Sequence, residues 1–301
     1  MPVAVPRARS DAARAAALLP GLFVVLWSTG FISAKYGLPY APPLKFLLVR
    51  FALVALLMSA VTLFMRAPWP SSARQLLHVA IAALLVHGLY LGGVFVSIAG
   101  GMAAGTSAML VGLQPIVTVF LARGFLGERI SARQWTGLAL GLVGVYCVVR
   151  HKIALDRDPA TLLPIVVALI GISIGTLYQK RFASRVDLRS GAVVQFTACV
   201  LAYAPIVGWL EPAPIDWTPQ FVFALAWSVI VLSVGAISLL YWLLRRGAVA
   251  DVARLFYLVP PVTAVMAYAL FGERLDAFAI AGMVLIAIGV ALARRRLRDD
   301  A

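Results

Sequence analysis

Long apolar runs separated by short polar segments dominate this chain. A helix needs roughly 20 mainly apolar residues to cross a bilayer, and runs of that length recur along the sequence. The region 75–122 contains no Asp, Glu, Lys or Arg. It is too long for one crossing, so we expect a break at Gly100-Gly101, where glycines allow a tight turn. The pattern predicts ten spanning helices, at about residues 18–36, 44–65, 75–97, 102–124, 134–150, 161–180, 190–210, 219–243, 250–271 and 276–293.

The ten spans form two copies of one unit, because the sequence repeats itself at an offset of 145 residues. QPIVTVFLARGFLGER at 114–129 returns as VPPVTAVMAYALFGER at 259–274, and similarity at one fixed offset indicates duplication. Five spans per copy is an odd number, so the second copy enters the membrane upside down. The predicted fold is therefore an all-α integral membrane protein with ten transmembrane helices in two inverted five-helix repeats, an architecture of carriers.

This division gives an N-terminal tail at 1–17, a first repeat at 18–150, a second repeat at 161–295 and a C-terminal tail at 296–301. Gly127 and Gly272 stand where the fourth and ninth helices should end, each followed by a glutamate, Glu128 or Glu273. Lys35 and Lys180 end the first and sixth helices, where a cation complements the helix dipole. The residues expected to have structural or hinge roles are Gly30, Pro115, Gly127, Glu128, Gly175, Pro260, Gly272 and Glu273.

Composition places the chain in lipid, because 62% of its residues are hydrophobic and only 13% are charged. The net charge of +14 does not indicate a nucleic-acid partner, since the cations stand in short clusters between apolar runs. Most of them fall on the cytoplasmic side when the N-terminus is inside, so we expect both termini in the cytoplasm and the protein in the cytoplasmic membrane. Cys147 and Cys199 lie in apolar runs without metal-ligand spacing, so no metal or cofactor is expected.

Several segments resemble the EamA family of the drug/metabolite transporter superfamily. The opening helix of that family is similar to the segment from Leu26-Trp27-Ser28-Thr29-Gly30 through Ala34-Lys35. Its second helix is similar to Val49-Arg50-Phe51. Pro115 through Gly127-Glu128 and Pro260 through Gly272-Glu273, each followed by a Gly-rich helix, resemble its repeated fourth and fifth helices. The resemblance covers nearly the whole chain apart from the N-terminal tail. It implies ten helices with both termini inside, and transport of small metabolites, often amino acids leaving the cell.

Ionisable groups inside a membrane are costly, so each is a candidate for function. All twelve Asp and Glu residues lie in tails, loops or predicted helix ends, which favours facilitative or exchange transport over carboxylate-coupled transport. Arg50 lies within the second span, where its guanidinium could receive a substrate carboxylate through two hydrogen bonds. The alternative role is packing, with the guanidinium bonded to backbone carbonyls or directed toward the interface.

His87 falls near the middle of the third span, and Tyr90 lies one turn further on the same face. They could line a cavity together, or His87 could donate one hydrogen bond between helices. Aromatic and amide side chains in other spans complete a mainly apolar cavity with a few polar groups. The predicted substrate-binding residues are Trp27, Ser28, Arg50, His87, Tyr90, Gln114, Tyr178, Gln179, Gln195, Tyr241 and Tyr257.

The leading functional hypothesis is an exporter of a small metabolite such as an amino acid, which alternates access to a central cavity between the repeats. A lipid-handling protein or a structural membrane subunit is the alternative, and a lateral opening in the bundle would favour it. An intramembrane enzyme is less favoured, because the sequence has no HExxH, no paired intramembrane Asp and no GxSxG. The expected partners are a small-molecule substrate and the lipid bilayer, and ten helices require no oligomer.

Overall fold

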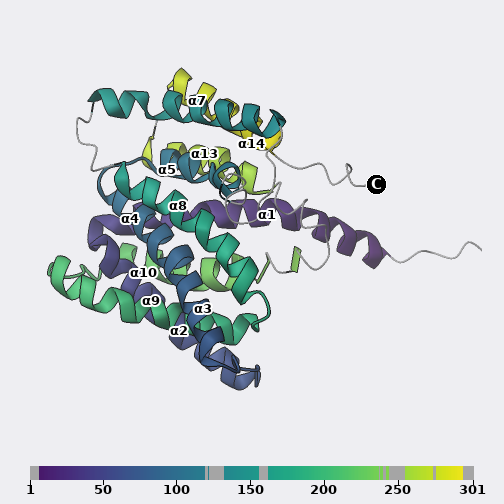
Figure 1. Cartoon of the computed structure of the whole chain (residues 1–301), viewed down its shortest axis with the longest axis vertical. Coiled ribbons are helices and arrows are strands. Elements are labelled where there is room, and N and C mark those ends of the chain that lie inside the picture. Colours follow the sequence, from purple (N-terminus) through teal and green to yellow (C-terminus); the bar gives the residue numbers. More distant parts are fainter. Residues whose placement is uncertain are drawn as a thin grey trace, which may run out of the picture.

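The computed structural model describes residues 7–118, 121, 132–155, 162–236, 238–239, 242–243, 255–273 and 276–293, and every regular element among them is helical (Figure 1). The first half contains α1 (Arg7–Gly37), the short η1 (Leu38–Tyr40), α2 (Pro43–Phe64), α3 (Ala73–Ala83), η2 (Leu84–Leu89), α4 (Tyr90–Ala99), α5 (Ala104–Val111) and α7 (Ala132–Leu155). The second half contains α8 (Leu163–Tyr178), η4 (Gln179–Ala183), α9 (Leu188–Leu210), α10 (Pro219–Ala226), η5 (Trp227–Ala236), η6 (Phe256–Leu258), α13 (Val259–Phe271) and α14 (Ala277–Ala293).

These elements join into ten helical stretches over the described residues, as the hydropathy pattern predicts. Five stretches are composite: η1 extends α1, η2 links α3 to α4, η4 extends α8, η5 extends α10, and η6 leads into α13. Six of the stretches are long and apolar enough to cross a membrane by length and composition. The predicted break at Gly100-Gly101 is confirmed, because α4 ends at Ala99, Gly101 has a φ of 92° and α5 begins at Ala104.

Some helix boundaries differ from the predicted ones. The candidate membrane span of the first helix begins at Leu18, as predicted, but the helix itself begins at Arg7, since the alanine-rich segment before Leu18 favours helix regardless of hydropathy. The fifth helix runs to Leu155, beyond the predicted end at 150. Gly272 ends α13 in the left-handed conformation, with a φ of 66°, as its predicted role requires. The matching predictions for Gly127 and Glu128 lie outside the described residues.

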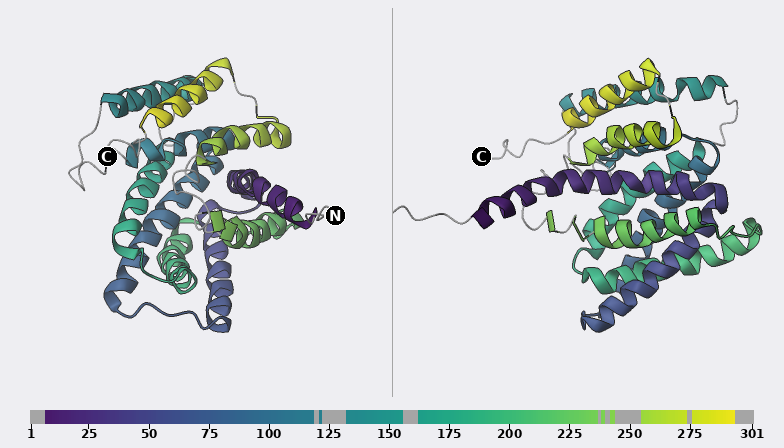
Figure 2. Two further views of the ribbon diagram at one scale, coloured as in Figure 1. Left: turned by 90° about the vertical axis from the view of Figure 1, so that its right-hand side faces the viewer. Right: turned by 180° about the vertical axis from the view of Figure 1, so that it is seen from behind.

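The helices pack in layers in which partners come mostly from opposite halves of the chain. The α7–α14 pair forms an outer layer next to α5 and α13 in every view (Figures 1 and 2). Below it, α1 packs against α13, α10 and η5, while α8 packs against α4 and η2, and α9 against α2 and α3. Most of the large buried side chains, including Phe23, Phe46 and Phe51, belong to one cluster that joins the two halves.

Contacts between the outer helices are reciprocal with respect to the 145-residue repeat. A Cβ added at Gly144 would lie 2.7 Å from the carbonyl oxygen of Gly282. A Cβ added at Gly289 would lie 2.5 Å from the carbonyl oxygen of Gly137. Gly137 and Gly282 are repeat counterparts, as are Gly144 and Gly289. Such an exchange of positions is what a two-fold axis generates. Small residues here let two helix backbones approach closely, as they do between membrane helices.

A second contact fits the same relation within the inner layers. Phe51 of α2 and Phe196 of α9 are repeat counterparts, and their ring centroids lie 5.9 Å apart. A residue that touches its own counterpart lies close to the axis that relates the two copies. In both the α2–α9 pair and the α7–α14 pair, the contacts are therefore those expected between two copies related by a two-fold axis.

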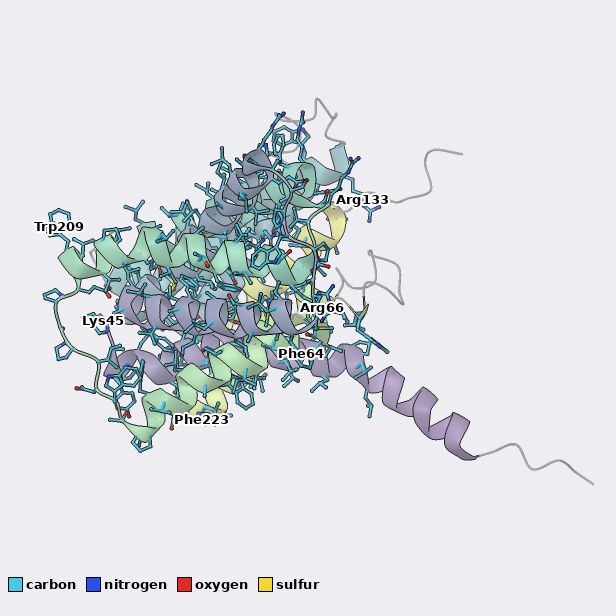
Figure 3. All side chains as sticks on the ribbon, turned by 90° about the horizontal axis from the view of Figure 1, so that it is seen from below. Lys45, Phe64, Arg66, Arg133, Trp209 and Phe223 are labelled. Atoms are coloured by element: carbon cyan, nitrogen blue, oxygen red, sulfur yellow. The ribbon has the colours of Figure 1, made fainter. Side chains whose placement is uncertain are left out.

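The bundle has two ends, which are named here by their residues. The η1 end carries η1, the turn 100–103, the segment 211–218 and Gly272-Glu273; the Arg66 end carries the segment 65–72 and the turn 184–187. Figure 3 shows Lys45 and Trp209 at the first end and Arg66 and Arg133 toward the second. Because successive helices alternate direction, each end collects every second connection.

The close α7–α14 packing makes a prediction about stability. Gly289→Leu should lower the free energy of unfolding by about 1–3 kcal/mol, because the new side chain meets backbone atoms of Gly137 and Gly141 that cannot move aside. Thermal unfolding of the purified protein in detergent measures the loss. Gly208→Leu is the matched control, since a Cβ there has no neighbour within 4 Å. Equal stability of both variants would contradict this packing.

Candidate functional site

A central cavity of about 680 Å³ runs from the Arg66 end to the middle of the bundle. Asp187 and Arg189 lie at its outer end, and His87 and Ser233 at its inner end. Its walls come from both halves of the chain, and its lining residues are Met58, Val79, His87, Gln179, Ala183, Val186, Asp187, Leu188, Arg189, Gly191, Ala192, Gln195, Phe196, Ser233, Val234, Ser238 and Trp242.

His87 lies at the inner end of this cavity because of an irregular helix. It belongs to η2, a π-helical segment at Leu84–Leu89, and the repeat counterpart of that segment falls within the π-helical η5. Extra residues per turn change the direction of side chains, and such segments are frequent at functional sites. The Nε2 of His87 lies 3.3 Å from Oε1 of Gln195, and its ring stacks on Phe196 with centroids 4.7 Å apart.

Arg50 lies next to the inner end of the cavity and is 7% exposed. Its Nη2 donates to Oγ of Ser233 over 3.4 Å, and its Nε has no hydrogen-bond partner among the described residues. His87 and Tyr90 lie close enough to interact with it electrostatically. An incompletely bonded guanidinium is costly to bury, so this end of the cavity is suited to an anion that would satisfy it.

Ser233 is a site residue that the sequence analysis misses. Its hydroxyl donates to the carbonyl of Ser228 over 3.0 Å and accepts from Arg50. A single hydroxyl in an apolar run carries little signal of its own. The repeat offset does carry one, because the counterpart of Ser233 is Gly88, the neighbour of His87.

The structure brings four of the predicted substrate-binding residues together at this inner end: Arg50, His87, Tyr90 and Gln195. Gln179 also lines the cavity, nearer the Arg66 end. Tyr178 lies beside it, where its Oη is 2.7 Å from Nδ1 of His78. Tyr241 and the side chain of Tyr257 lie outside the described residues.

Three other predicted residues contact neighbouring helices. Trp27 packs between Phe23 and Phe256, with centroids 5.4 and 5.1 Å away. Ser28 is fully buried and donates to the carbonyls of Val24 and Val259, while Gln114 donates to Thr176 over 3.4 Å. These contacts join α1 to α13 and the segment after α5 to α8. A role for the three residues in substrate binding stays a prediction.

Corresponding helices of the two copies are interrupted just before a proline. The fourth stretch breaks at Gly112-Leu113 and is helical again over 114–118, with Pro115 in its first turn. The ninth changes from η6 to α13 at Val259, so Pro260 also begins a helix. A proline lacks the N–H that would continue the helix, and it disfavours helical geometry in the residue before it. The hinge role of these prolines stays a prediction.

A second pocket, of about 230 Å³, lies beside this interruption. It is lined by residues of α5 and its C-cap, of α13 and of α14, which include Met109, Gly112, Pro260 and Met283. Its lining is almost wholly apolar, so it offers little to orient a polar ligand. The central cavity combines apolar walls with a few converging polar groups, which is typical of small-molecule sites.

Charges along the central cavity are unevenly distributed. Asp187 pairs with Arg189 at 2.9 Å, and the Arg189 side chain holds the pKa of Asp187 below its ordinary value. Asp187 is the one carboxylate among the lining residues, and it lies at the outer end. Arg50 stands at the inner end. The arrangement can therefore hold a ligand whose carboxylate or other anionic group points inward.

Comparisons with known proteins point to one family. The EamA-like transporter family matches residues 15–150 and again 160–295. The uncharacterized transporter YvbV of Bacillus subtilis is 26% identical over 92% of this chain and 90% of its own length. A probable amino-acid metabolite efflux pump of Salmonella typhimurium is 28% identical over 89% and 91%. A solved crystal structure shares the fold, with a TM-score of 0.61 and 19% identity over 93% of this chain and 97% of the other.

Arg50 allows a test that separates a binding role from a packing role. Arg50→Met should leave the unfolding temperature of the ligand-free protein unchanged or raise it, because methionine removes a buried charge while Ser233 keeps its bond to Ser228. Thermal unfolding in detergent is the measurement. A loss of more than about 2 kcal/mol would instead assign Arg50 a structural role.

Proposed function

The chain belongs to the EamA-like transporter family, and from that premise we propose that it exports a small metabolite, such as an amino acid, by alternating access. It is a multi-pass membrane protein of a transporter family and not an enzyme. The proposal depends most on the central cavity, which reaches one end of the bundle and has His87 and Gln195 in its lining, with Arg50 next to its inner end through Ser233. A cavity accessible from one side is what a carrier needs in one of its two states.

We propose that the two halves are inverted repeats. The contacts Gly144–Gly282 and Gly137–Gly289 support this, because residue numbers rise along one helix as they fall along the other. Two antiparallel helices that exchange equivalent contacts are related by an axis perpendicular to both. For helices that cross a bilayer, such an axis lies in the membrane plane, as in carriers built from inverted repeats.

Charge supports an orientation with the Arg66 end in the cytoplasm. The described cations toward that end are Arg7, Arg9, Arg14, Arg66, Arg74, Arg133, Lys180, Arg181, Arg185 and Arg189, whereas Lys35, Lys45, Arg150 and Lys152 lie toward the η1 end. Short loops rich in Lys and Arg remain on the cytoplasmic side. Both termini would then be cytoplasmic, and the cavity would open to the cytoplasm, from which an exporter takes its substrate.

Substrate class follows from the inner end of the cavity. The guanidinium of Arg50, whose Nε has no hydrogen-bond partner within the described part of the chain, favours a carboxylate over a cation. His87 and Gln195 supply further hydrogen-bonding groups, and Phe196 supplies an apolar surface. The Salmonella typhimurium relative is named a probable amino-acid metabolite efflux pump, which agrees with a zwitterionic ligand.

A ligand-stabilisation screen tests the substrate class. An amino acid that binds the native state should raise the unfolding temperature of the detergent-purified protein, by an amount that grows with its concentration. The gain should disappear in Arg50→Met and in His87→Leu, because these remove the groups at the inner end. Arg74→Met is the matched control and should keep the gain, since Arg74 is an exposed arginine outside the cavity lining.

Two outcomes of the screen would contradict the proposal. A gain that persists in both cavity variants would place the amino-acid site elsewhere. Stabilisation by phospholipids but by no amino acid would favour the lipid-handling alternative, for which the apolar pocket between α5, α13 and α14 would be the candidate site.

Transport should be facilitative or exchange-like, because the carboxylates among the described residues lie at helix ends or loops rather than in mid-span. In proteoliposomes, external unlabelled substrate should drive counterflow of labelled substrate without an imposed ion gradient. Accumulation of substrate that requires a proton or Na⁺ gradient would contradict this expectation.

A further inference from the structure

At the η1 end, α1, α5 and α13 meet at one charged contact between the two copies. Glu273, which follows α13, accepts hydrogen bonds from the backbone N–H groups of Ala104 (3.1 Å) and Gly105 (3.4 Å) at the start of α5. The same carboxylate forms an ion pair with Lys35 near the end of α1. One largely buried glutamate of the second copy therefore binds two helices of the first copy, α1 and α5.

The strength of this contact comes from its geometry. A carboxylate at a helix N-terminus satisfies N–H groups that have no partner within the helix, and it complements the positive end of the helix dipole. Glu273 is only 10% exposed in its side chain, so water screens the ion pair with Lys35 little. Gly105 lets α5 approach α13, since an added Cβ there would lie 3.2 Å from Cα of Ala264.

An aromatic cluster lies beside this charged contact, since a Cβ added at Gly37, two residues after Lys35, would lie 2.5 Å from the ring of Phe46. Phe46 of α2, Phe95 of α4 and Phe221 of α10 are each at most 1% exposed, and the ring of Phe46 meets the other two edge to face at 5.2 and 5.1 Å. Phe46 precedes Arg50 by four residues, so the two side chains lie on one face of α2. The rings therefore close the η1 end directly beyond the inner end of the cavity.

At the Arg66 end, the starts of α3 and α9 are capped by residues of their own copy. Ser72 caps α3 through Gln75 N at 3.2 Å, and Asp187 caps α9 through Arg189 N at 2.9 Å. Both caps are local, within a few residues of the helix they serve. The cavity reaches this end. At the η1 end, carboxylates from the other copy hold the starts of α2 and α5, while Thr218 and Asp276 provide local caps for α10 and α14.

We propose that Lys35, Glu273 and the start of α5, together with the rings of Phe46, Phe95 and Phe221, form a gate that closes the cavity at the η1 end. This inference rests on the alternating-access carrier proposed above and assigns the contacts that must break when the cavity changes sides. Glu273 is the central residue, because its one carboxylate holds both α1 and α5.

Glu211 provides a matched control on the same face. It also links the two copies through a carboxylate, which accepts from the N–H groups of Leu44 (3.0 Å) and Lys45 (2.7 Å) at the start of α2. However, α2 and α9 pack together extensively in their middle as well, through contacts such as Phe51–Phe196. Loss of the Glu211 cap should therefore weaken one helix end without opening the cavity.

Accessibility of a single cysteine tests the gate without needing a substrate. Val234→Cys, in a chain with Cys147→Ser and Cys199→Ala, places a thiol in the cavity lining. A membrane-impermeant maleimide is applied to vesicles of each orientation. The parent should react from the side of the Arg66 end, and Glu273→Gln should increase reaction from the η1 side roughly tenfold or more, since a charged hydrogen-bonded contact is lost.

Further variants sharpen the result. Lys35→Met should give a smaller increase than Glu273→Gln, because Glu273 still caps α5, and it serves as the second test if Glu273→Gln does not fold. Exchange of the two charges in Lys35→Glu/Glu273→Lys should not restore closure, since it restores an ion pair but places a cation at the N-terminus of α5. Full closure in the exchanged variant would overturn the role of the α5 contact.

The remaining outcomes show whether the gate proposal fails alone or together with the carrier proposal. A parent labelled equally from both sides would overturn the one-sided cavity, and with it both the carrier and the gate. A parent labelled from one side, with no change in Glu273→Gln or Lys35→Met, would overturn the gate alone. An equal increase in Glu211→Gln would also overturn it, because any loosened helix end would then have the same effect.

Discussion

Packing between the two copies is the interaction on which the rest of the structure depends. Each major inter-helix contact joins one half of the chain to the other, from the glycines of α7 and α14 to the Phe51–Phe196 pair. Helices in lipid gain little from the hydrophobic effect and must associate through close packing and hydrogen bonds. Among the described residues, most of the large buried side chains belong to one cluster shared by the two halves, and the lining of the central cavity also comes from both.

Departures from regular helix determine where the chemistry lies within that pair. The π-helical η2 and η5 carry His87 and Ser233, and the interruptions before Pro115 and Pro260 divide the fourth and ninth stretches. Irregular backbone is tolerated in a membrane where protein or a cavity satisfies its polar groups. The irregular segments η2 and η5 both contribute to the lining of the central cavity, whereas the residues at the interruptions, such as Gly112 and Pro260, line the apolar pocket.

Much of the fold could be predicted from the sequence, because span length and the 145-residue offset are properties of the chain alone. The partners of individual side chains depend on helix rotation, which hydropathy does not determine. Gly30 and Gly175 occupy matching positions, yet a Cβ at Gly175 would lie 2.6 Å from Val86, whereas the nearest neighbour at Gly30 is Leu232 at 3.8 Å. Arg50 and His87 could be selected because buried ionisable groups are rare, whereas Ser233 has no such signal.

The copies are not equivalent, and in the alternating-access carrier proposed above their differences would favour the state in which the cavity reaches the Arg66 end. Phe46 has Gly191 as its counterpart, and Phe221 has Leu76. Three packed rings close the η1 end, whereas Gly191 lines the open cavity and Leu76 is 40% exposed. Opening the η1 end would separate buried rings and a charged contact. The matching positions at the Arg66 end carry smaller side chains, whose packing on closure of that end would replace less of the lost contact. A substrate can reverse this preference only by binding the opposite state more tightly, so the groups around Arg50 must contact it differently in the two states.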